Sequence, residues 1–474
     1  MSSETNRREF LKSTTVALMA VSASGLGQGS SAGAAPRSGE IARRLTSGEL
    51  RYQAQPSLAW RNGHAEGNVI ELNPDKTYQE MLGFGAAFTD AACYTFNRLD
   101  PSVREALFHE LFHPSEMALN VCRTCIGASD YSTELFSYDE GDPDPDMQRF
   151  SIAHDQSYVL PMLREARKQN PELFLFSSPW SPPGWMKAGG SMLGGSMRQK
   201  FFAPYAKYFV KFLQAYAAEG VPVQAVTVQN EVDTDQDARM PACIWPQEYE
   251  MAFVKNHLGP AVAQSGLSTK IWILDHNYNL WGRAVAELDD PGVRQYCNAV
   301  AFHGYVGTPE QMSNFHEVHP QAQIYWTEGG PDYTAPDFMT DWVKWGQRFV
   351  EITRNWTQSI TGWNLALDES GKPNIGPFPC GGLVTVHSRT REITRCGQYW
   401  AFAHFSRHVQ RGAKRFESAG STAGVEHVAF KNPDGEQVVV IANSGSAKVV
   451  HLQQSASMAE IPLPADSVST LYWK

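Results

Sequence analysis

Eight short apolar runs follow one another along the chain from about residue 80, and helix-like segments lie between most of them. The runs are MLGFGAAF, MALNVCRTCIG, LFLFSSPW, VQAVTVQNE, KIWILDHN, AVAFHGY, QIYWTEGG and ITGWNLAL. Such runs predict buried strands, and strands that alternate with helices predict a parallel sheet. Eight of them fit a closed (β/α)₈ barrel. The alternative is an open doubly wound sheet, which the lack of a glycine-rich phosphate loop after the first strand disfavours.

Three of the intervening segments have the spacing of amphipathic helices. SVREALFHELF follows the first run, QSYVLPMLREARKQ the second and YAKYFVKFLQAYAAEG the third. In the last, Tyr205, Tyr208, Phe209 and Phe212 are three, one and three residues apart, and Gly220 marks its end.

The two ends of the chain differ from its middle. Apolar runs on both sides of Asp434-Gly435 predict a β-hairpin, and SVSTLYWK predicts a last strand. Upstream, a polar stretch extends to about residue 55, and EGNVIELNP predicts one strand that ends at Asn73-Pro74. We expect a small antiparallel β domain from about residue 410, which the strand near residue 70 would join. The expected parts are an N-terminal segment, a barrel and a C-terminal β domain: 36–78, 79–405 and 406–474.

The first 35 residues are typical of an export signal. Arg7 and Arg8 precede an apolar stretch, STTVALMAVSASGLG, and the small-residue segment SSAGAA. This order resembles a twin-arginine signal, which predicts a periplasmic or secreted protein that folds in the cytoplasm without needing disulfides. A charged tail and a membrane anchor are the alternatives. The apolar stretch is short for a membrane span, and no later stretch is typical of one.

Composition excludes several classes of protein. Hydrophobic residues are 42% and charged residues 19%, which allows a large core and argues against global disorder. The formal net charge of −10 argues against nucleic acid as a partner. Seven cysteines leave at least one unpaired. Cys122 and Cys125 form a CxxC, but alternation along a strand sends them to opposite faces, so we expect buried thiols and no redox or zinc motif.

Two of the apolar runs end in a glutamate, at Glu231 and Glu328. Catalytic groups are usually found at the C-terminal ends of barrel strands. A pair of carboxyl groups about 5–5.5 Å apart, one a nucleophile and the other a protonated acid, is what a retaining glycosidase needs. Burial and the charge of the nucleophile both favour a proton on the partner. Either glutamate alone could be a salt-bridged loop residue.

Other polar and aromatic residues at strand ends are candidates for sugar binding. Asn230 would donate to a sugar 2-hydroxyl, and Tyr305 would hold and tune Glu328. His303 would contact the sugar or the nucleophile, or would be structural. The remaining candidates compete with roles in ion pairs or core packing: Arg123 and Asp130, Trp180 and Trp185 in SSPWSPPGW, and Trp363 and Asn364.

Asp275 and His276 end the fifth run, but no three-ligand spacing accompanies them. We therefore expect no metal site. A serine hydrolase is also disfavoured, because the chain has no GxSxG elbow.

The motifs GFGAAFTDAA, SSPWSPPGWMK, YFVKFLQAYAAEGVPVQAVTVQNE, WTEGG and GWNLALDESGKPN resemble glycoside hydrolase family 30, which includes the lysosomal glucosylceramidases. The resemblance extends from about residue 70 to the C-terminus. It implies a retaining (β/α)₈ barrel with a side β-sandwich domain built from both chain ends, and no metal or organic cofactor. It matches Glu231 to the family's acid/base and Glu328 to its nucleophile. The residues that it assigns to the sugar subsite are Arg123, Asp130, Trp180, Asn230, His303, Tyr305 and Trp363.

The chain departs from the family pattern near the leaving-group side. Val232 stands where the family often has proline, Gly304 where the glucosylceramidases carry tryptophan, and DTDQDARMPACIWPQEYE resembles them poorly. The family spans β-glucosidases, glucosylceramidases, endo-β-1,6-glucanases, β-xylosidases and xylanases. We favour a β-glucoside or β-1,6-glucan over xylan. A non-catalytic carbohydrate-binding barrel is the alternative of another class, but binding alone would not need both glutamates. Oligomeric state and endo or exo action stay open.

Overall fold

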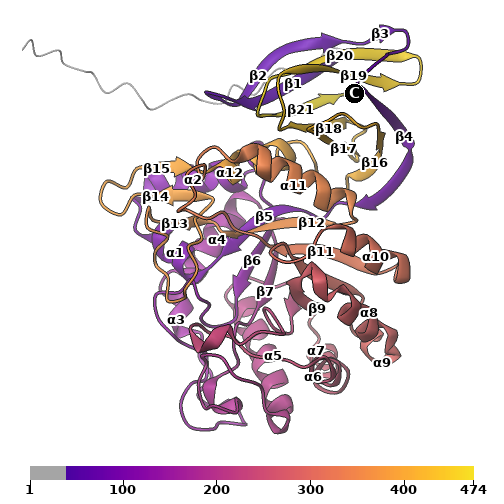
Figure 1. Cartoon of the computed structure of the whole chain (residues 1–474). Helices are drawn as coiled ribbons and strands as arrows, with labels where there is room; N and C mark the ends of the chain where they lie inside the picture. Colours follow the sequence, from indigo (N-terminus) through magenta and orange to yellow (C-terminus); the bar gives the residue numbers. More distant parts are fainter. Residues whose placement is uncertain (1–38) are drawn as a thin grey trace, which may run out of the picture. The chain divides into compact units, whose positions relative to one another are not determined.

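A computed structural model describes residues 39–474 (Figure 1). The predicted export signal, residues 1–35, lies outside the described residues. Eight parallel strands close into a barrel in the order β10-β11-β12-β5-β6-β7-β8-β9, which confirms the barrel prediction. Each overlaps one of the predicted apolar runs: β5 (Gly83–Phe88), β6 (Val121–Cys125), β7 (Phe174–Ser178), β8 (Ala225–Thr227), β9 (Lys270–Asn277), β10 (Ala299–His303), β11 (Gln323–Glu328) and β12 (Ser359–Asn364).

Helices form the outer layer of the barrel. Helix α5 buries Tyr205, Tyr208, Phe209 and Phe212, as its spacing predicts, and its apolar side chains share one large cluster with outward-facing strand residues such as Val226. The α-helices are α1 (Asp90–Asn97), α2 (Pro101–Phe112), α3 (Ala153–Gln156), α4 (Val159–Gln169), α5 (Phe202–Ala218), α6 (Gln247–Phe253), α7 (Gly259–Gln264), α8 (Trp281–Asp289), α9 (Pro291–Arg294), α10 (Glu310–Val318), α11 (Trp342–Arg354) and α12 (Gly397–Ser406). The short 3₁₀ and π turns are η1 (Gly184–Met186), η2 (Gln199–Phe201), η3 (Gln236–Ala238), η4 (Val254–Leu258) and η5 (Tyr278–Leu280).

Inward-facing apolar side chains fill the N-terminal half of the barrel. Trp272 stacks on Tyr325 with ring centroids 4.1 Å apart and also contacts Phe176. The interior is therefore a packed floor. The cysteines of the CxxC motif lie in different apolar clusters, Cys122 in the outer one and Cys125 in another, as expected for opposite faces of a strand. All seven cysteines of the chain are free thiols.

Strands from both ends of the chain form a second, larger sheet in the order β2-β1-β21-β18-β17-β16-β4-β19-β20-β3. Ile41, Leu72 and Ile461 lie at distant places in this order but share one apolar cluster, so the sheet folds over on itself as a β-sandwich. The hairpin prediction at Asp434-Gly435 is confirmed by β17 and β18. The strands are β1 (Glu40–Ser47), β2 (Leu50–Ala59), β3 (Arg61–Asn62), β4 (Val69–Glu80), β16 (Lys414–Ala419), β17 (Val425–Lys431), β18 (Gln437–Asn443), β19 (Lys448–Gln454), β20 (Ser457–Leu463) and β21 (Ser467–Trp473).

The polar stretch before residue 55 holds β1 and the first half of β2, which pair across a tight turn at Gly48-Glu49. The interpretation of the next predicted strand was wrong. Strand β4 does not end at Pro74 but continues to Glu80. Strand β16 pairs with Asn73 and next with Thr77, so Pro74 lies in a bulge. A proline is tolerated there because a bulge does not need its missing N–H.

Two smaller features complete the fold. Strands β13 (Ala366–Leu367), β14 (Val384–Val386) and β15 (Ile393–Arg395) form a three-stranded sheet. Helix α11 contacts the sandwich, because Arg354 donates hydrogen bonds to the backbone oxygens of Ser418 at 3.0 Å and His427 at 3.2 Å. Among residues 39–474, no helix has both the length and the apolar character that crossing a membrane requires.

Candidate active site

A cavity of about 550 Å³ opens at the C-terminal ends of the barrel strands, and Glu231 and Glu328 both line it. His303, fully buried at the end of β10, lies between them. Its Nδ1 is 3.5 Å from Glu231 Oε1 and 4.0 Å from Glu328 Oε1. The two carboxylate oxygens can therefore be no farther apart than the sum of these distances. This upper limit allows the carboxyl separation of about 5–5.5 Å found in retaining glycosidases, and it also allows the shortest separations found in inverting ones.

Irregular backbone aims these acids into the cavity. Glu231, just after β8, has a φ of 55°, and its N–H donates to the backbone oxygen of Asp275 at 3.0 Å. In β9, Leu274 and Asp275 have φ values of 72° and 47°, next to a shift in the pairing with β10. Leu274 consequently joins the outer cluster while Asp275 faces inward. Each such residue costs about 1–3 kcal/mol, and this kind of strain concentrates at functional sites.

Arg123 is fully buried beneath the cavity and connects its charged groups. Its Nη1 donates to Glu328 Oε2, and its Nη2 donates to Asn230 Oδ1 at 2.8 Å and to Asp275 Oδ2 at 2.7 Å. Burial alone would raise the pKa of Asp275, but the charge of Arg123 and the hydrogen bond with His303 hold it well below its usual range. The buried ion pair considered for Arg123 thus exists, with Asp275 and Glu328 as partners.

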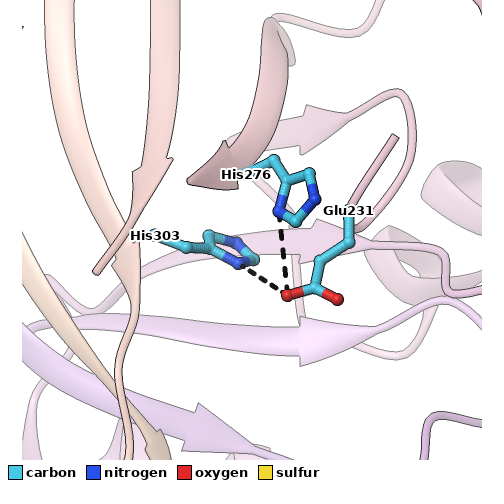
Figure 2. Close-up of side chains that lie close together, drawn as sticks. All are labelled: Glu231, His276 and His303. Atoms are coloured by element: carbon cyan, nitrogen blue, oxygen red, sulfur yellow. Dashed lines mark ion pairs between the residues drawn. The ribbon is translucent and has the colours of Figure 1, made fainter. Parts of the chain in front are cut away.

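The two glutamates have different surroundings. The Tyr305 hydroxyl donates to Glu328 Oε1 at 2.9 Å, as expected from the sequence. Gln236 donates to Glu231 Oε2 at 2.7 Å, while Nδ1 of His276 lies 3.7 Å from Glu231 Oε1, near that of His303 (Figure 2).

These surroundings change where the proton is expected. Burial would raise the pKa of Glu231, but the nearby imidazoles of His303 and His276 outweigh it and lower this pKa. Burial would lower the pKa of His303, but Glu328 and Asp275 raise it to about 9. Burial, on which the sequence expectation of a proton on Glu231 relied, is therefore opposed here by the two imidazoles that face that carboxylate.

Aromatic and polar groups line the rest of the cavity. Trp180 and Trp363 stack with centroids 5.0 Å apart and both line it. Asp130 lines it too, and its buried Oδ1 has no hydrogen-bond partner in the described part of the chain. Burial, then the charges of Glu328 and Glu231, raise the pKa of Asp130. The cavity therefore offers flat rings and an oxygen acceptor, both suited to a sugar.

Asn230 is a further polar group of the lining. Because its Oδ1 accepts from Arg123, its Nδ2 group is the donor left for a sugar hydroxyl.

Two of the predicted residues lie elsewhere. Trp185 is buried, and its Nε1 donates to the backbone oxygen of Asp139 at 2.8 Å. Asn364 does not line the cavity. Its Oδ1 accepts from Thr89 Oγ1 at 2.8 Å, and Thr89 caps helix α1, so Asn364 connects β12 to that helix.

The sequence interpretation missed Asp275, His276 and Gln236 as members of the site. Asp275 and His276 end a barrel strand, which is the signal that identified the glutamates, but we considered them only as metal ligands. Gln236 lies in the irregular loop after Glu231, where no periodic pattern indicates its position.

Part of the cavity lining is apolar, and some of it is exposed. Val306 is 52% exposed and Phe378 38% exposed, and both line the cavity with Met240, Pro331 and Pro379.

Gly304, where the chain departs from the glucosylceramidase pattern, packs closely against Trp326. A Cβ at Gly304 would lie 2.6 Å from Cζ2 of Trp326, so a larger residue there would require Trp326 to move.

Comparison with known proteins agrees with this geometry. Residues 81–409 match the glycosyl hydrolase family 30 TIM-barrel domain, and residues 412–471 match the glycosyl hydrolase family 30 beta sandwich domain. An endo-1,6-beta-D-glucanase of Neurospora crassa is 33% identical over 395 residues, which are 79% of this chain and 81% of the relative. The lysosomal acid glucosylceramidase of Mus musculus is 28% identical over 436 residues, covering 87% and 85%.

Solved structures give the same result. An endo-beta1,6-glucanase superposes with a TM-score of 0.83 at 29% identity, over 92% of this chain and 99% of that one. The GH30 xylanase C of Talaromyces cellulolyticus shares the fold, with a TM-score of 0.71 at 23% identity over 86% and 100%. Both domains and the cavity at the strand ends lead to one conclusion: the chain belongs to glycoside hydrolase family 30.

Proposed function

We propose that this glycoside hydrolase cleaves β-glucosidic bonds with retention, through a covalent glycosyl-enzyme. Glu328 attacks the anomeric carbon. Glu231 protonates the leaving oxygen and then activates the water that releases the sugar. The observation that carries this proposal is the meeting of Glu231 and Glu328 around His303 in one cavity, close enough to act on one anomeric centre.

The neighbouring groups have roles that fit this scheme. Arg123 and Tyr305 donate to the two oxygens of Glu328, which orients the carboxylate for attack. The proton that Glu231 needs can come from His303, whose raised pKa makes it an imidazolium at neutral pH and whose Nδ1 lies 3.5 Å away. Asp275 accepts from the other nitrogen of His303 at 3.0 Å and holds the ring in place.

For the substrate, we propose β-1,6-glucan. Support comes from the Neurospora crassa relative and from the superposed endo-beta1,6-glucanase. A second candidate is a β-glucoside with an apolar leaving group, such as glucosylceramide. The exposed side chains of Val306 and Phe378 in the cavity lining favour it, because an acyl chain would cover them.

A substrate comparison tests the proposal. We expect the highest kcat/KM on β-1,6-linked gluco-oligosaccharides, with lower values on glucosylceramide in mixed micelles and on aryl β-xyloside or xylan. Glu328→Gln should abolish hydrolysis of each substrate while the variant still binds the sugar. Preference for xylan would contradict the substrate, and full activity of Glu328→Gln would contradict the role of Glu328.

We also propose that the chain is exported by a twin-arginine route to the periplasm or the medium. The Arg7-Arg8 pair and the following apolar stretch support it, and seven free thiols suit folding before export. Replacing both Arg7 and Arg8 with Lys should retain the full-length chain in the cytoplasm, measured by fractionation and N-terminal sequencing. Unchanged export of this variant would exclude the route.

A further inference from the structure

Two buried imidazole nitrogens at the active site lack a hydrogen-bond partner among residues 39–474: Nδ1 of His276, which lines the cavity, and Nδ1 of His303. The side chains are 7% and 0% exposed. Both nitrogens face the same oxygen, Glu231 Oε1, at 3.7 Å and 3.5 Å (Figure 2). These separations exceed an ordinary hydrogen bond, so the three groups converge without satisfying one another.

The far nitrogen of each ring meets a second carboxylate. Nε2 of His276 lies 2.5 Å from Asp233 Oδ1, and Nε2 of His303 lies 3.0 Å from Asp275 Oδ1. A carboxylate at Nε2 fixes the ring so that Nδ1 points at the other two donors, and a metal ion binding there would displace the Nδ1 proton of His303. Metal-ligating histidines are oriented in this way by outer carboxylates.

The spacing of the donors suits a small cation. Four ligands at about 2.0–2.2 Å from zinc in a tetrahedron put neighbouring donor atoms roughly 3.4 Å apart. The ring nitrogens and the carboxylate oxygen lie within 4.8 Å of one another. The two separations between a ring nitrogen and the Glu231 oxygen, 3.7 Å and 3.5 Å, are close to the spacing around zinc.

The surrounding charge also favours a cation. In the described part of the chain, Arg123 is the one permanent cation in direct contact with the carboxylates around these donors. The carboxylates are those of Glu231, Asp233, Asp275 and Glu328.

We propose that Glu231, His276 and His303 bind Zn²⁺ or a similar divalent transition metal, and that the bound metal inhibits the enzyme. Three protein ligands leave a fourth position for water. Water can reach this position from the cavity, because Glu231 and His276 both line it. The metal would occupy the oxygen that Glu231 needs for proton transfer. This differs from the sequence expectation of no metal site, because the ligands come from three separate strand ends. Binding rests on geometry alone, whereas inhibition rests on the proposed role of Glu231.

Calorimetric titration of Zn²⁺ into the full chain tests the binding. We expect one tight site in the wild type and its loss in His276→Gln. The matched control is His109→Gln with His113→Gln, which removes an imidazole pair stacked at 4.3 Å outside the cavity. The control should keep the tight site. Equal Zn²⁺ binding by His276→Gln, or a tight site that disappears with His109 and His113, would overturn the proposal.

A milder variant guards against misfolding. The side chain of Asp233 is 44% exposed, so Asp233→Asn should fold, and loss of this outer partner should weaken Zn²⁺ binding about 10–100-fold. Co²⁺ bound at the same place should give the strong visible absorption of a four-coordinate ion in the wild type, and none in His276→Gln. Unaltered Zn²⁺ affinity of Asp233→Asn would contradict the outer-carboxylate geometry.

The inhibition has a separate readout. The Zn²⁺ concentration that halves hydrolysis should rise in Asp233→Asn by the same factor as its dissociation constant for Zn²⁺. Undiminished hydrolysis with the site filled would overturn the inhibitory role. If no β-glucoside were hydrolysed at all, the proposed function would fail, while the titration and the Co²⁺ spectrum would still decide whether the metal site exists.

Discussion

The two ends of the barrel interior are built from the same strands but from opposite chemistry. At the N-terminal end, Val121, Trp272 and Tyr325 belong to a buried apolar layer. Farther along the same strands, β6 carries Arg123 and β11 ends at Glu328, which form an ion pair. The apolar layer and the charged layer are therefore only two or three residues apart along a strand.

The difference between the ends also appears in the backbone. The lower layer follows regular alternation, whereas β9 and β11 change register beside Asp275 and Glu328. Buried ion pairs contribute little net stability compared with apolar side chains of the same size. The apolar floor therefore stabilises the barrel, and the upper layer is arranged for chemistry on a rigid base.

The largest contrast between the two layers should appear in turnover. Glu328→Gln removes the proposed nucleophile, and kcat should fall on the order of 10⁴-fold or more. Tyr325→Phe, in the apolar layer of the same strand, removes only a hydroxyl and should change kcat little. Steady-state kinetics of the two variants on one β-glucoside check this, and comparable losses would mean that the ends do not differ in function.

The next largest effect should be on the free energy of unfolding, which depends on both layers. Arg123→Met leaves Asp275 and Glu328 buried without their cation and should cost about 3–5 kcal/mol at pH 7. Trp272→Ala should cost about as much, because it leaves a cavity in the lower layer. Urea unfolding measures both.

The pH dependence of these two losses separates charge from packing. The pKa of Asp275 is held below its unfolded value, so the stability it contributes is present above about pH 4 and is lost as the pH falls. The deficit of Arg123→Met should therefore shrink below about pH 4, whereas that of Trp272→Ala should stay constant. A constant deficit in both variants would contradict the charge assignment.

Two buried histidines give the next contrast, because their pKa values shift in opposite directions. His303 has its pKa raised to about 9, whereas burial lowers that of His404, which lies between Thr46 and Thr470, to about 3. A raised pKa contributes stability below the unfolded value of about 6.5, and this is lost as the pH rises through 9. Unfolding free energy should fall by up to about 3 kcal/mol over that range.

The matched variants identify the source of this decline. His303→Gln should remove it, while His404→Gln should keep it, since His404 is already neutral at these pH values. Urea unfolding at several pH values between 6.5 and 9.5 provides the measurement; an alkaline decline that persists in His303→Gln would assign it to another group.

The smallest contrast lies within one loop. Trp180 lines the cavity and Trp185 does not. Trp180→Leu should raise KM roughly 2–10-fold through lost ring contacts, while Trp185→Leu should lower stability and leave KM unchanged. KM changes of equal size would mean that the loop responds as a unit.

The barrel was predictable because each strand is a local apolar run, and the glutamates were conspicuous because each ends one. Local sequence patterns did not predict where a strand ends or which way a side chain faces when a neighbouring strand determines it. Considered alone, Pro74 predicts the end of a strand, but a bulge against β16 accommodates it. Asp275 faces inward because Leu274 and Asp275 both adopt a positive φ beside a shift in the pairing with β10.

The direction of the Glu231 pKa shift was not predictable for a related reason. Burial, which a sequence suggests, would raise its pKa, but His276 and His303 come from two other strands and reverse the direction. Their convergence is also what creates the proposed metal site, so neither feature is visible in any single motif.

The most direct test of the account is the anomeric configuration of the first product. Proton NMR, recorded during the first minutes of hydrolysis of a β-glucoside, should show the β-anomer appearing first and the α-anomer only through later mutarotation. Initial release of the α-anomer would mean direct attack by water and would contradict a glycosyl-enzyme on Glu328.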